Sequence, residues 1–241
     1  MADFVQLWVY LSATPLFGLT ATLVVYLLAH LVYQRFDHAP WANPVLWSVV
    51  VLACGLLATK VPYQSYFAGA QFIHFLLGPA VVALAWPLWQ RRAELRQRWF
   101  RLLLAALAGT VAAAGSSLLL GWMFDLPSEL VRSLVPKSVT APVAMGIAAQ
   151  IGGIPALAAV FAVITGLVGA LSAKYLFAGL QIPTTPDGWA ARGFALGTAS
   201  HGIGAARAMQ VDANAGAYAG LALGMQVVLA SLLIPLVFKL L

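Results

Sequence analysis

A short polar segment between two prolines carries the first group of residues that could do chemistry. Lys137, Ser138 and Thr140 lie between Pro136 and Pro142, within an otherwise apolar stretch. Each proline lacks an N–H donor and pushes the residue before it toward an extended conformation, so the segment is predicted to be unwound. An ammonium group, two hydroxyls and the N-terminus of the following helix can together bind an anion. The alternative is a loop at a membrane surface in which Lys137 is simply solvated.

A second polar segment lies further along the chain. Its candidate binding residues are Thr198, Ser200, His201 and Arg207. Glycines are frequent here and predict a helix break near Gly202 or Gly204. An arginine in an apolar membrane segment is costly unless it is paired or hydrated, so Arg207 is a candidate bidentate clamp for an anion. Two alternatives stay open: Arg207 snorkels to the interface or pairs with Asp212, and His201 is a satisfied buried group.

The acidic residues indicate the charge of the ligand. All seven lie at segment ends or in loops: Asp3, Asp37, Glu94, Asp125, Glu129, Asp187 and Asp212. Cation and proton carriers commonly place a carboxylate at mid-membrane depth, so a charged cargo is expected to be an anion. The chain lacks a phosphate-binding loop, zinc-ligand spacing and a nucleophile–base–acid set, so we expect no enzyme activity, metal or cofactor. Coupling to H⁺ or Na⁺ remains open.

The composition indicates what positions these residues. Of 241 residues, 62% are hydrophobic and only 8% are charged, and the mean hydropathy is +0.92. A soluble domain carries about 25% charged residues. So few ionised groups could not cover the surface of a soluble globule, which excludes the water-soluble classes. The chain is therefore predicted to be a polytopic membrane protein.

Eight apolar segments follow one another along the chain. They cover residues 16–33, 44–57, 67–89, 102–124, 131–151, 155–177, 190–209 and 215–240. The prediction is an all-α polytopic membrane protein with about 6–8 transmembrane segments, including two interrupted or re-entrant ones. It forms one integral-membrane domain, 1–241, with a four-span half (1–124) and a half that carries the site (128–241). Breaks are expected at Gly78–Pro79, at Pro136 and Pro142, at Gly152–Gly153, and at Gly202 and Gly204.

The net charge of +6 arises mainly from one short stretch. Residues 91–101 hold five arginines against one acid, Glu94. The positive-inside rule places this arginine loop in the cytoplasm. Anionic lipid is a competing partner for the arginines, and no nucleic acid is expected.

Small residues recur at four-residue spacing in two of the long apolar segments, 155–177 and 215–240. They are Ala162, Gly166 and Ala170, and then Gly216, Gly220 and Gly224. Such faces let helices approach one another closely and predict helix packing rather than chemistry.

At these motifs the sequence resembles the LrgB/CidB family of bacterial membrane proteins, whose relatives include the plastid glycolate/glycerate translocator. The likeness rests on 136–144 (PKSVTAPVA), 150–155 (QIGGIP), 193–201 (GFALGTASH) with Arg207–Ala208, and the GPA of 78–80. It covers most of the chain from about Tyr66 onward. One departure is Ala205, where family members often carry threonine, which leaves the role of that hydroxyl in doubt here.

The resemblance implies two functions of different classes. One is transport of small monocarboxylates such as glycolate, glycerate or pyruvate. The other is a holin/antiholin-like role, in which a small partner membrane subunit helps to modulate murein hydrolase export and autolysis. The two polar, cationic segments favour transport, because a pore needs no such paired site. We therefore expect both segments to flank a carboxylate near the bilayer midplane, in a homo-oligomer that works by alternating access.

Overall fold

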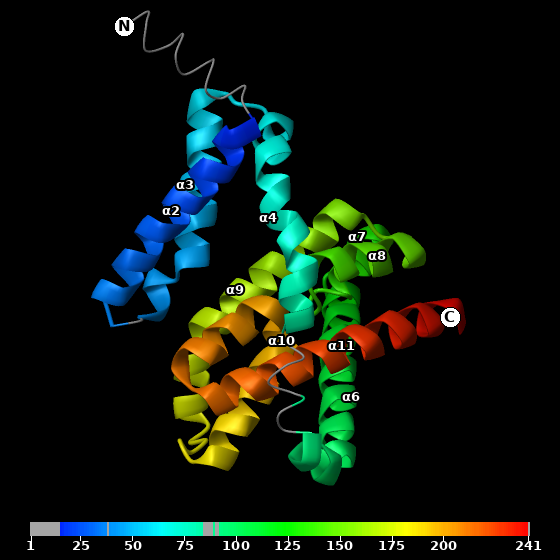
Figure 1. Ribbon diagram of the computed structural model, residues 1–241. Coiled ribbons are helices and arrows are strands. Elements are labelled where there is room, and N and C mark those ends of the chain that lie inside the picture. The colour runs from blue at the N-terminus through cyan, green and yellow to red at the C-terminus, as the bar shows by residue number, and fades with distance from the viewer. Residues whose placement is uncertain (1–14, 38, 84–88, 90–91, 241) are drawn as a thin grey trace, which may run out of the picture. The chain divides into compact units, whose positions relative to one another are not determined.

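The computed structural model describes residues 15–37, 39–83, 89 and 92–240. The chain divides into two compact units, residues 1–83 and 84–241. Throughout the described ranges the regular secondary structure is helical, which confirms the all-α prediction (Figure 1). The expected division between the halves lay after residue 124. In the structure the helix that spans residues 92–123 instead belongs to the second unit.

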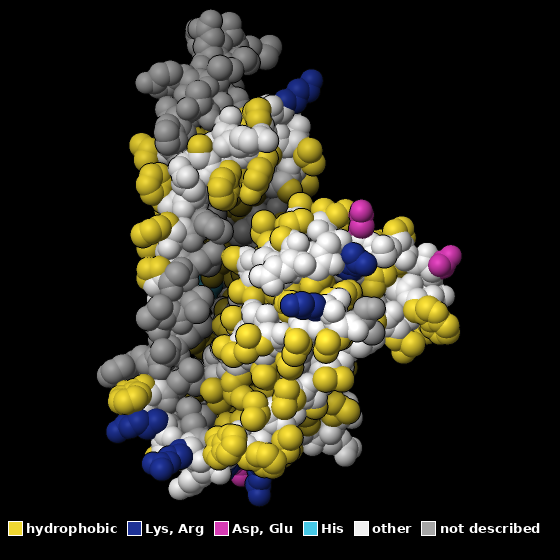
Figure 2. Space-filling model, turned by 90° about the vertical axis from the view of Figure 1, so that its right-hand side faces the viewer, with side chains coloured by type: hydrophobic (Ala, Val, Ile, Leu, Met, Phe, Trp, Pro, Cys, Tyr) yellow, Lys and Arg dark blue, Asp and Glu magenta, His cyan; other side chains and the backbone are white. Residues whose placement is uncertain are grey.

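Within the described part of the chain, four helices are long and apolar enough to cross a bilayer: Leu16–Arg35, Arg96–Met123, Pro155–Gly179 and Ala213–Leu240. Their large apolar side chains are often exposed, as with Leu28 (58%), Val168 (58%) and Leu232 (65%). Figure 2 shows such side chains spread over much of the described surface on one face. Acyl chains are the solvent that tolerates this much exposed apolar surface, so the membrane class is confirmed.

The first unit contains helices α2 (Pro15–Arg35), α3 (Pro44–Thr59) and α4 (Tyr63–Ala83), with a 3-10 turn η1 (Pro40–Ala42) between α2 and α3. The Asn43 side chain accepts hydrogen bonds from the backbone N–H groups of Val45 (2.9 Å) and Leu46 (3.1 Å), which caps α3. The break expected at Gly78–Pro79 is wrong, because α4 continues through Pro79. A proline lacks the N–H donor, so one backbone carbonyl in the preceding turn loses its hydrogen bond. Transmembrane helices tolerate this where another group donates a hydrogen bond to that carbonyl.

The second unit contains α6 (Arg92–Met123), α7 (Ser128–Leu134), α8 (Ala141–Ile151), α9 (Pro155–Gly179), α10 (Pro186–Val211) and α11 (Ala213–Leu240). The arginine-rich stretch, expected as a loop, is helical from Arg92 onward. The expected interruption at Pro136 and Pro142 is confirmed: the chain leaves helical geometry between α7 and α8, and Thr140 is the N-cap residue of α8. Gly152 ends α8 with a left-handed φ of 77°, and Pro155 opens α9, as expected.

Helix α10 folds back on itself. Its backbone is non-helical at Ser200 (φ −124°, ψ 15°) and His201 (φ 41°, ψ −133°). A straight helix of 26 residues would be about 39 Å long. The side chain of Asn214, just after α10, nevertheless donates a hydrogen bond of 3.2 Å to the carbonyl of Pro186 at its start. The two limbs of α10 therefore form a hairpin whose tip is Ser200–His201. The break was expected near Gly202 or Gly204, and it lies directly before Gly202, at Ser200 and His201.

The ends of the helices define two ends of the second unit. Arg98, near the start of α6, forms a 2.8 Å ion pair with Asp187 at the start of α10. We call this the arginine end. Only six residues separate the end of α9 from the start of α10, so α9 ends near the arginine end. Because α9 is about 37 Å long, it starts at the opposite end of the unit, where α6 also finishes. Helices α7 and α8 connect these two helix ends, and the N–H of Ile154 donates to Ser133 Oγ (2.7 Å).

Glycines let α10 and α11 pack at backbone contact. A Cβ atom at Gly193 would lie 2.0 Å from the carbonyl oxygen of Ala215, and one at Gly197 would lie 2.2 Å from that of Ala219. Both pairs advance together along the two helices, so the first limb of α10 runs alongside the start of α11 in the same direction. Small residues at this interface agree with the packing role predicted for the glycine-rich segments.

Candidate functional site

A cavity of about 800 Å³ lies inside the second unit. Its walls come from α6, the unwound segment between α7 and α8, α9, the first limb of α10, and α11. Along α6 it extends from Arg98 to Ala113, a distance of about 22 Å. The cavity therefore connects the arginine end with the unwound segment.

The inner end of the cavity is polar. Lys137, Ser138, Thr165 and Thr198 line it. The Lys137 ammonium donates a 2.9 Å hydrogen bond to the carbonyl of Ala113 and also contacts Ser117 Oγ, both on α6. Among the described residues these two neutral groups are its partners, and the acid on the cavity wall is Asp187, which pairs with Arg98. A charged ammonium group held by neutral dipoles alone attracts an anion.

The depth of Lys137 follows from its partner on α6. Ala113 is the middle residue of the apolar span 102–124. Because the Lys137 ammonium lies against the Ala113 carbonyl, it lies about halfway along the apolar part of α6. A cation at that depth is expensive unless it is paired or hydrated, and it is therefore a candidate functional group.

Thr198 brings a free hydroxyl to the same wall. The residue is only 7% exposed. Its hydroxyl has no hydrogen-bond partner among the described residues. Its methyl group lies against Gly109 on α6, where a Cβ atom would lie 2.4 Å from Thr198 Cγ2. A buried hydroxyl without a partner is costly, so a ligand oxygen in the cavity would satisfy it.

The structure places the other expected binding residues elsewhere. Thr140 occupies the N-cap position of α8 without a side-chain capping hydrogen bond. Arg207 lies in the second limb of α10, is 9% exposed and has a partner within the protein. Neither residue belongs to the described cavity wall. A continuous helix would place Ser200, Gly204 and Arg207 on one face, but the backbone reverses at Ser200–His201.

Ser200 and His201 anchor the tip of α10 against α9. His201 is 4% exposed, and its Nε2 lies 2.8 Å from the carbonyl oxygen of Ala162. A Cβ atom at Gly166 would lie 2.9 Å from the imidazole ring, and one at Gly169 would lie 1.7 Å from Ser200 Oγ. His201 therefore matches the alternative interpretation of a satisfied buried group. The positive φ of a non-glycine residue is strained, and this packing holds it in place.

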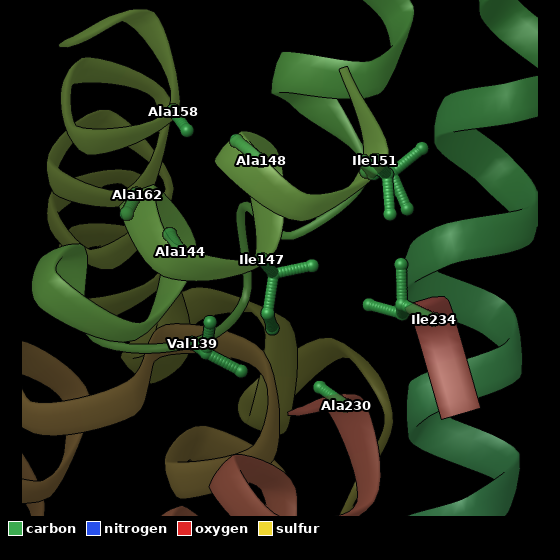
Figure 3. Close-up of a cluster of buried hydrophobic side chains, with 10 residues drawn as sticks. Val139, Ala144, Ile147, Ala148, Ile151, Ala158, Ala162, Ala230 and Ile234 are labelled. Carbon is green, nitrogen blue, oxygen red and sulfur yellow. The ribbon is translucent and has the colours of Figure 1, made fainter. Parts of the chain in front are cut away.

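On the other side of the unwound segment lies a cluster of buried apolar residues. We call it the apolar plug. Its labelled members in Figure 3 are Val139, Ala144, Ile147, Ala148, Ile151, Ala158, Ala162, Ala230 and Ile234. They come from the unwound segment, α8, the first turns of α9 and the later part of α11. Lys137 and Ser138 thus face the cavity, whereas their neighbours Val135 and Val139 belong to the plug.

Three residues near the inner end were missed from the sequence. Thr165 and Tyr218 line the cavity, and Gln226 lies buried on α11, bonded to Thr110 of α6. The signal was present for Gln226, because a carboxamide in the middle of a long apolar run needs a buried partner. No pattern in the sequence marks Thr165 or Tyr218 as cavity residues.

Replacing Thr198 by valine is expected to weaken anion binding at this wall about tenfold. Valine keeps the shape of threonine and removes only the unpartnered hydroxyl, and one hydrogen bond contributes about 1 kcal/mol or somewhat more. The measurement is the dissociation constant of glycolate for the purified protein, by isothermal titration. Thr59→Val removes an exposed threonine hydroxyl at the end of α3, away from the cavity wall, and is the matched control. Equal affinities in Thr198→Val and Thr59→Val would exclude Thr198 from the site.

The comparisons with known proteins agree on one family. The model of the LrgB-like family matches residues 22–240. A protein named uncharacterized protein YwbG from Bacillus subtilis is 37% identical over 83% of this chain and 86% of its own length. Holin-like protein CidB from Staphylococcus aureus is 27% identical over 100% of this chain and 99% of its own length.

A second CidB, from Staphylococcus epidermidis, is 27% identical over 96% of this chain and 98% of its own length. No solved structure matches the chain. These relatives match this chain over most of its length, and the arrangement of the helices comes from the present structure alone.

Proposed function

The chain belongs to the LrgB-like family of holin-like membrane proteins, and on that premise we propose that it transports small monocarboxylates such as glycolate, glycerate or pyruvate. The observation that carries the proposal is the Lys137 ammonium, which lines a large cavity and has neutral partners in the described chain. A carboxylate is the simplest anion that would pair with one ammonium and two hydroxyls.

In this proposal the carboxylate lies at the inner end of the cavity. The Lys137 ammonium donates to one carboxylate oxygen, and the hydroxyls of Ser138 and Thr198 donate to the remaining oxygens. These charge-assisted hydrogen bonds are stronger than neutral ones. The apolar wall, which includes Phe194 and several alanines, accepts the carbon chain of the substrate. Arg207 is not part of this binding mode, because it is off the described wall.

Alternating access would use the two folded-back segments. The hairpin of α10 leaves from and returns to the arginine end, and α7 and α8 connect helix ends at the opposite end. We propose that they are re-entrant segments which enter the bilayer from opposite faces and meet at the cavity. Inverted repeats with interrupted helices at mid-membrane depth are a common architecture of secondary transporters.

The proposal also assigns the two sides of the membrane. If the arginine end is cytoplasmic, the cavity lies on the cytoplasmic side of Lys137, and the apolar plug closes the other side. Separation of α8 from the plug residues of α9 and α11 would then expose Lys137 to the opposite side. The protein would act in the bacterial inner membrane, where it assembles as a homo-oligomer.

The second candidate is a holin-like function. The names of the CidB relatives support it, and they fit it better than they fit carboxylate transport. In this role the protein would assemble with a small holin-like subunit and modulate the export of murein hydrolases. This function needs helix association but makes no use of the Lys137 cavity.

Uptake of radiolabelled glycolate and pyruvate into proteoliposomes distinguishes the candidates. Transport predicts uptake that saturates with concentration and is inhibited by the unlabelled acid, with no release of a trapped dye. Liposomes that carry the protein in denatured form provide the background. Release of the dye without saturable uptake would overturn the transport proposal and favour the holin-like function.

A further inference from the structure

Charged side chains line the large cavity where it reaches the arginine end. We call this part of the cavity the mouth. Arg98 and Arg101 of α6 and Asp187 of α10 belong to its wall. The two arginines are three residues apart in the sequence, so they lie on one face of α6. The binding mode above places the carboxylate at the inner end, against Lys137, and uses none of the side chains at the mouth.

The charges on the cavity wall favour an anion at both ends of the cavity. Among the described wall residues the cations are Arg98, Arg101 and Lys137, and the acid is Asp187. Between the two ends, α6 and α10 contribute mainly alanines to the wall. Their short side chains leave room for a small anion to pass with water around it. An anion that enters from the arginine end therefore meets the two arginines before it reaches Lys137.

The ion pair between Arg98 and Asp187 is weak enough to exchange. Its nitrogen–oxygen distance is 2.8 Å, but 43% of the Arg98 side chain and 80% of the Asp187 side chain are exposed. Such a pair contributes little net free energy, because water solvates the separated partners almost as well. Asp187 also lies in the first turn of α10, where the helix dipole stabilises a negative charge without Arg98. A carboxylate from solution can therefore replace Asp187 on Arg98 at little cost.

Arg101 is available to the same carboxylate. It is exposed at the mouth and has no acidic partner in the part of the chain that the structure describes. Side chains three residues apart on a helix start about 5–6 Å from each other, so the guanidinium groups of Arg98 and Arg101 can reach one carboxylate together. Hydrogen bonds between guanidinium and carboxylate groups are charge-assisted and therefore stronger than neutral ones.

We propose that Arg98 and Arg101 form a second anion site, the mouth site, which binds the carboxylate of the acid on its way between Lys137 and the solution at the arginine end. Asp187 is the built-in competitor, which holds Arg98 while the mouth site is empty. The inference rests on the proposed function and adds a binding step to it. The site recognises only the anionic group, and anionic lipid headgroups share that chemistry, so the test includes both.

The test places a thiol just inside the mouth. Ala105 lines the cavity four residues after Arg101, and Ala105→Cys is made together with Cys54→Ser, which removes the native cysteine. Two methanethiosulfonate reagents of similar size, one with a sulfonate and one with a trimethylammonium group, modify the purified protein in neutral detergent. Each rate is divided by the rate of that reagent with free 2-mercaptoethanol. The anionic reagent is expected to be favoured about tenfold, and glycolate should slow it.

Substitutions at the mouth define the role of each side chain. Arg98→Gln combined with Arg101→Gln should abolish both the preference for the anionic reagent and the protection by glycolate. Asp187→Asn should lower the glycolate concentration that gives half protection about threefold, because the competing carboxylate is gone. Arg96→Gln removes the same charge at an exposed position of α6 that is not part of the described wall, and as the matched control it should behave as the parent does.

The outcomes separate this inference from the transport proposal, because the thiol measurements do not depend on uptake. A preference that survives in the double arginine variant, or an equal loss in Arg96→Gln, would overturn the mouth site. Slowing by added phosphatidylglycerol but not by glycolate would assign the arginines to lipid headgroups and would also overturn it. Absence of saturable glycolate uptake in proteoliposomes, with the expected thiol results intact, would overturn only the transport proposal.

Discussion

Lys137→Met is expected to reduce carboxylate uptake about 100-fold or more while the protein stays folded. Methionine keeps most of the length and volume of lysine but removes the charge. A hydrogen bond between charged groups contributes about 1.5–3 kcal/mol, and the substrate would lose its only cationic partner on the inner wall of the cavity. The two partners on α6 lose little, because the Ser117 hydroxyl also donates to the Ala113 carbonyl (2.9 Å). The measurement is the initial rate of glycolate uptake into proteoliposomes.

Lys174→Met is the matched control for the lost charge. Lys174 lies on α9 at an exposed position and is not part of the cavity wall. It should transport at the wild-type rate, and both variants should elute as the wild type does in size-exclusion chromatography. Uptake by Lys137→Met at the rate of Lys174→Met would remove Lys137 from the site. This result would also remove the main support for transport over the holin-like function.

Gly193→Ala is expected to destabilise the second unit by about 3 kcal/mol. The added Cβ atom would lie 2.0 Å from the carbonyl oxygen of Ala215 and 2.6 Å from its Cα atom. These are backbone atoms of α11 and cannot rotate aside, so α10 and α11 must separate. For a chain of this size a loss of that magnitude lowers Tm by about 6–12 °C. The measurement is thermal unfolding of the purified protein in detergent.

Gly224→Ala controls for the general effect of a glycine substitution in these helices. No atom lies within 4 Å of the place where its Cβ atom would be, and alanine favours a helix over glycine by about 1 kcal/mol. Its Tm should equal or exceed that of the wild type. If Gly193→Ala unfolded at the same temperature as Gly224→Ala, the close approach of α10 and α11 would be wrong.

The contrast between Gly193 and Gly224 shows a limit of pattern-based prediction. Gly216, Gly220 and Gly224 form a regular four-residue repeat that predicts a packing face. In the structure Gly216 packs against Met209, while the position at Gly224 is open. The spacing identifies one face of a helix, but whether another helix covers that face depends on the length and direction of its neighbours.

Local signals were sufficient for the interruption between α7 and α8. Pro136 and Pro142 cannot both continue a helix, and Gly152 and Pro155 mark the end of α8 and the start of α9. The position of Lys137 within that interruption was therefore predictable from neighbours in the sequence. Asn43 before Pro44 is a similar local signal, and its side chain caps α3.

The tip of α10 could not be predicted in the same way. The glycines Gly202 and Gly204 are locally the most permissive residues, yet the reversal occurs at Ser200 and His201. Contacts that are distant in the sequence select this position, because the Ala162 carbonyl and the missing side chains of Gly166 and Gly169 accept the two side chains. These contacts stabilise the strained positive φ of His201, which its local conformational preference alone would disfavour.

By itself, the sequence determined the membrane class, the apolar segments, the unwound polar segment and the excess of positive charge. These properties depend on composition and on residues within one or two helical turns of each other. Only the tertiary structure decided that α10 folds back, that Lys137 and Thr198 share one cavity, and that Gln226 is bonded to Thr110 of α6. These features depend on contacts between helices far apart in the sequence, which no local pattern encodes.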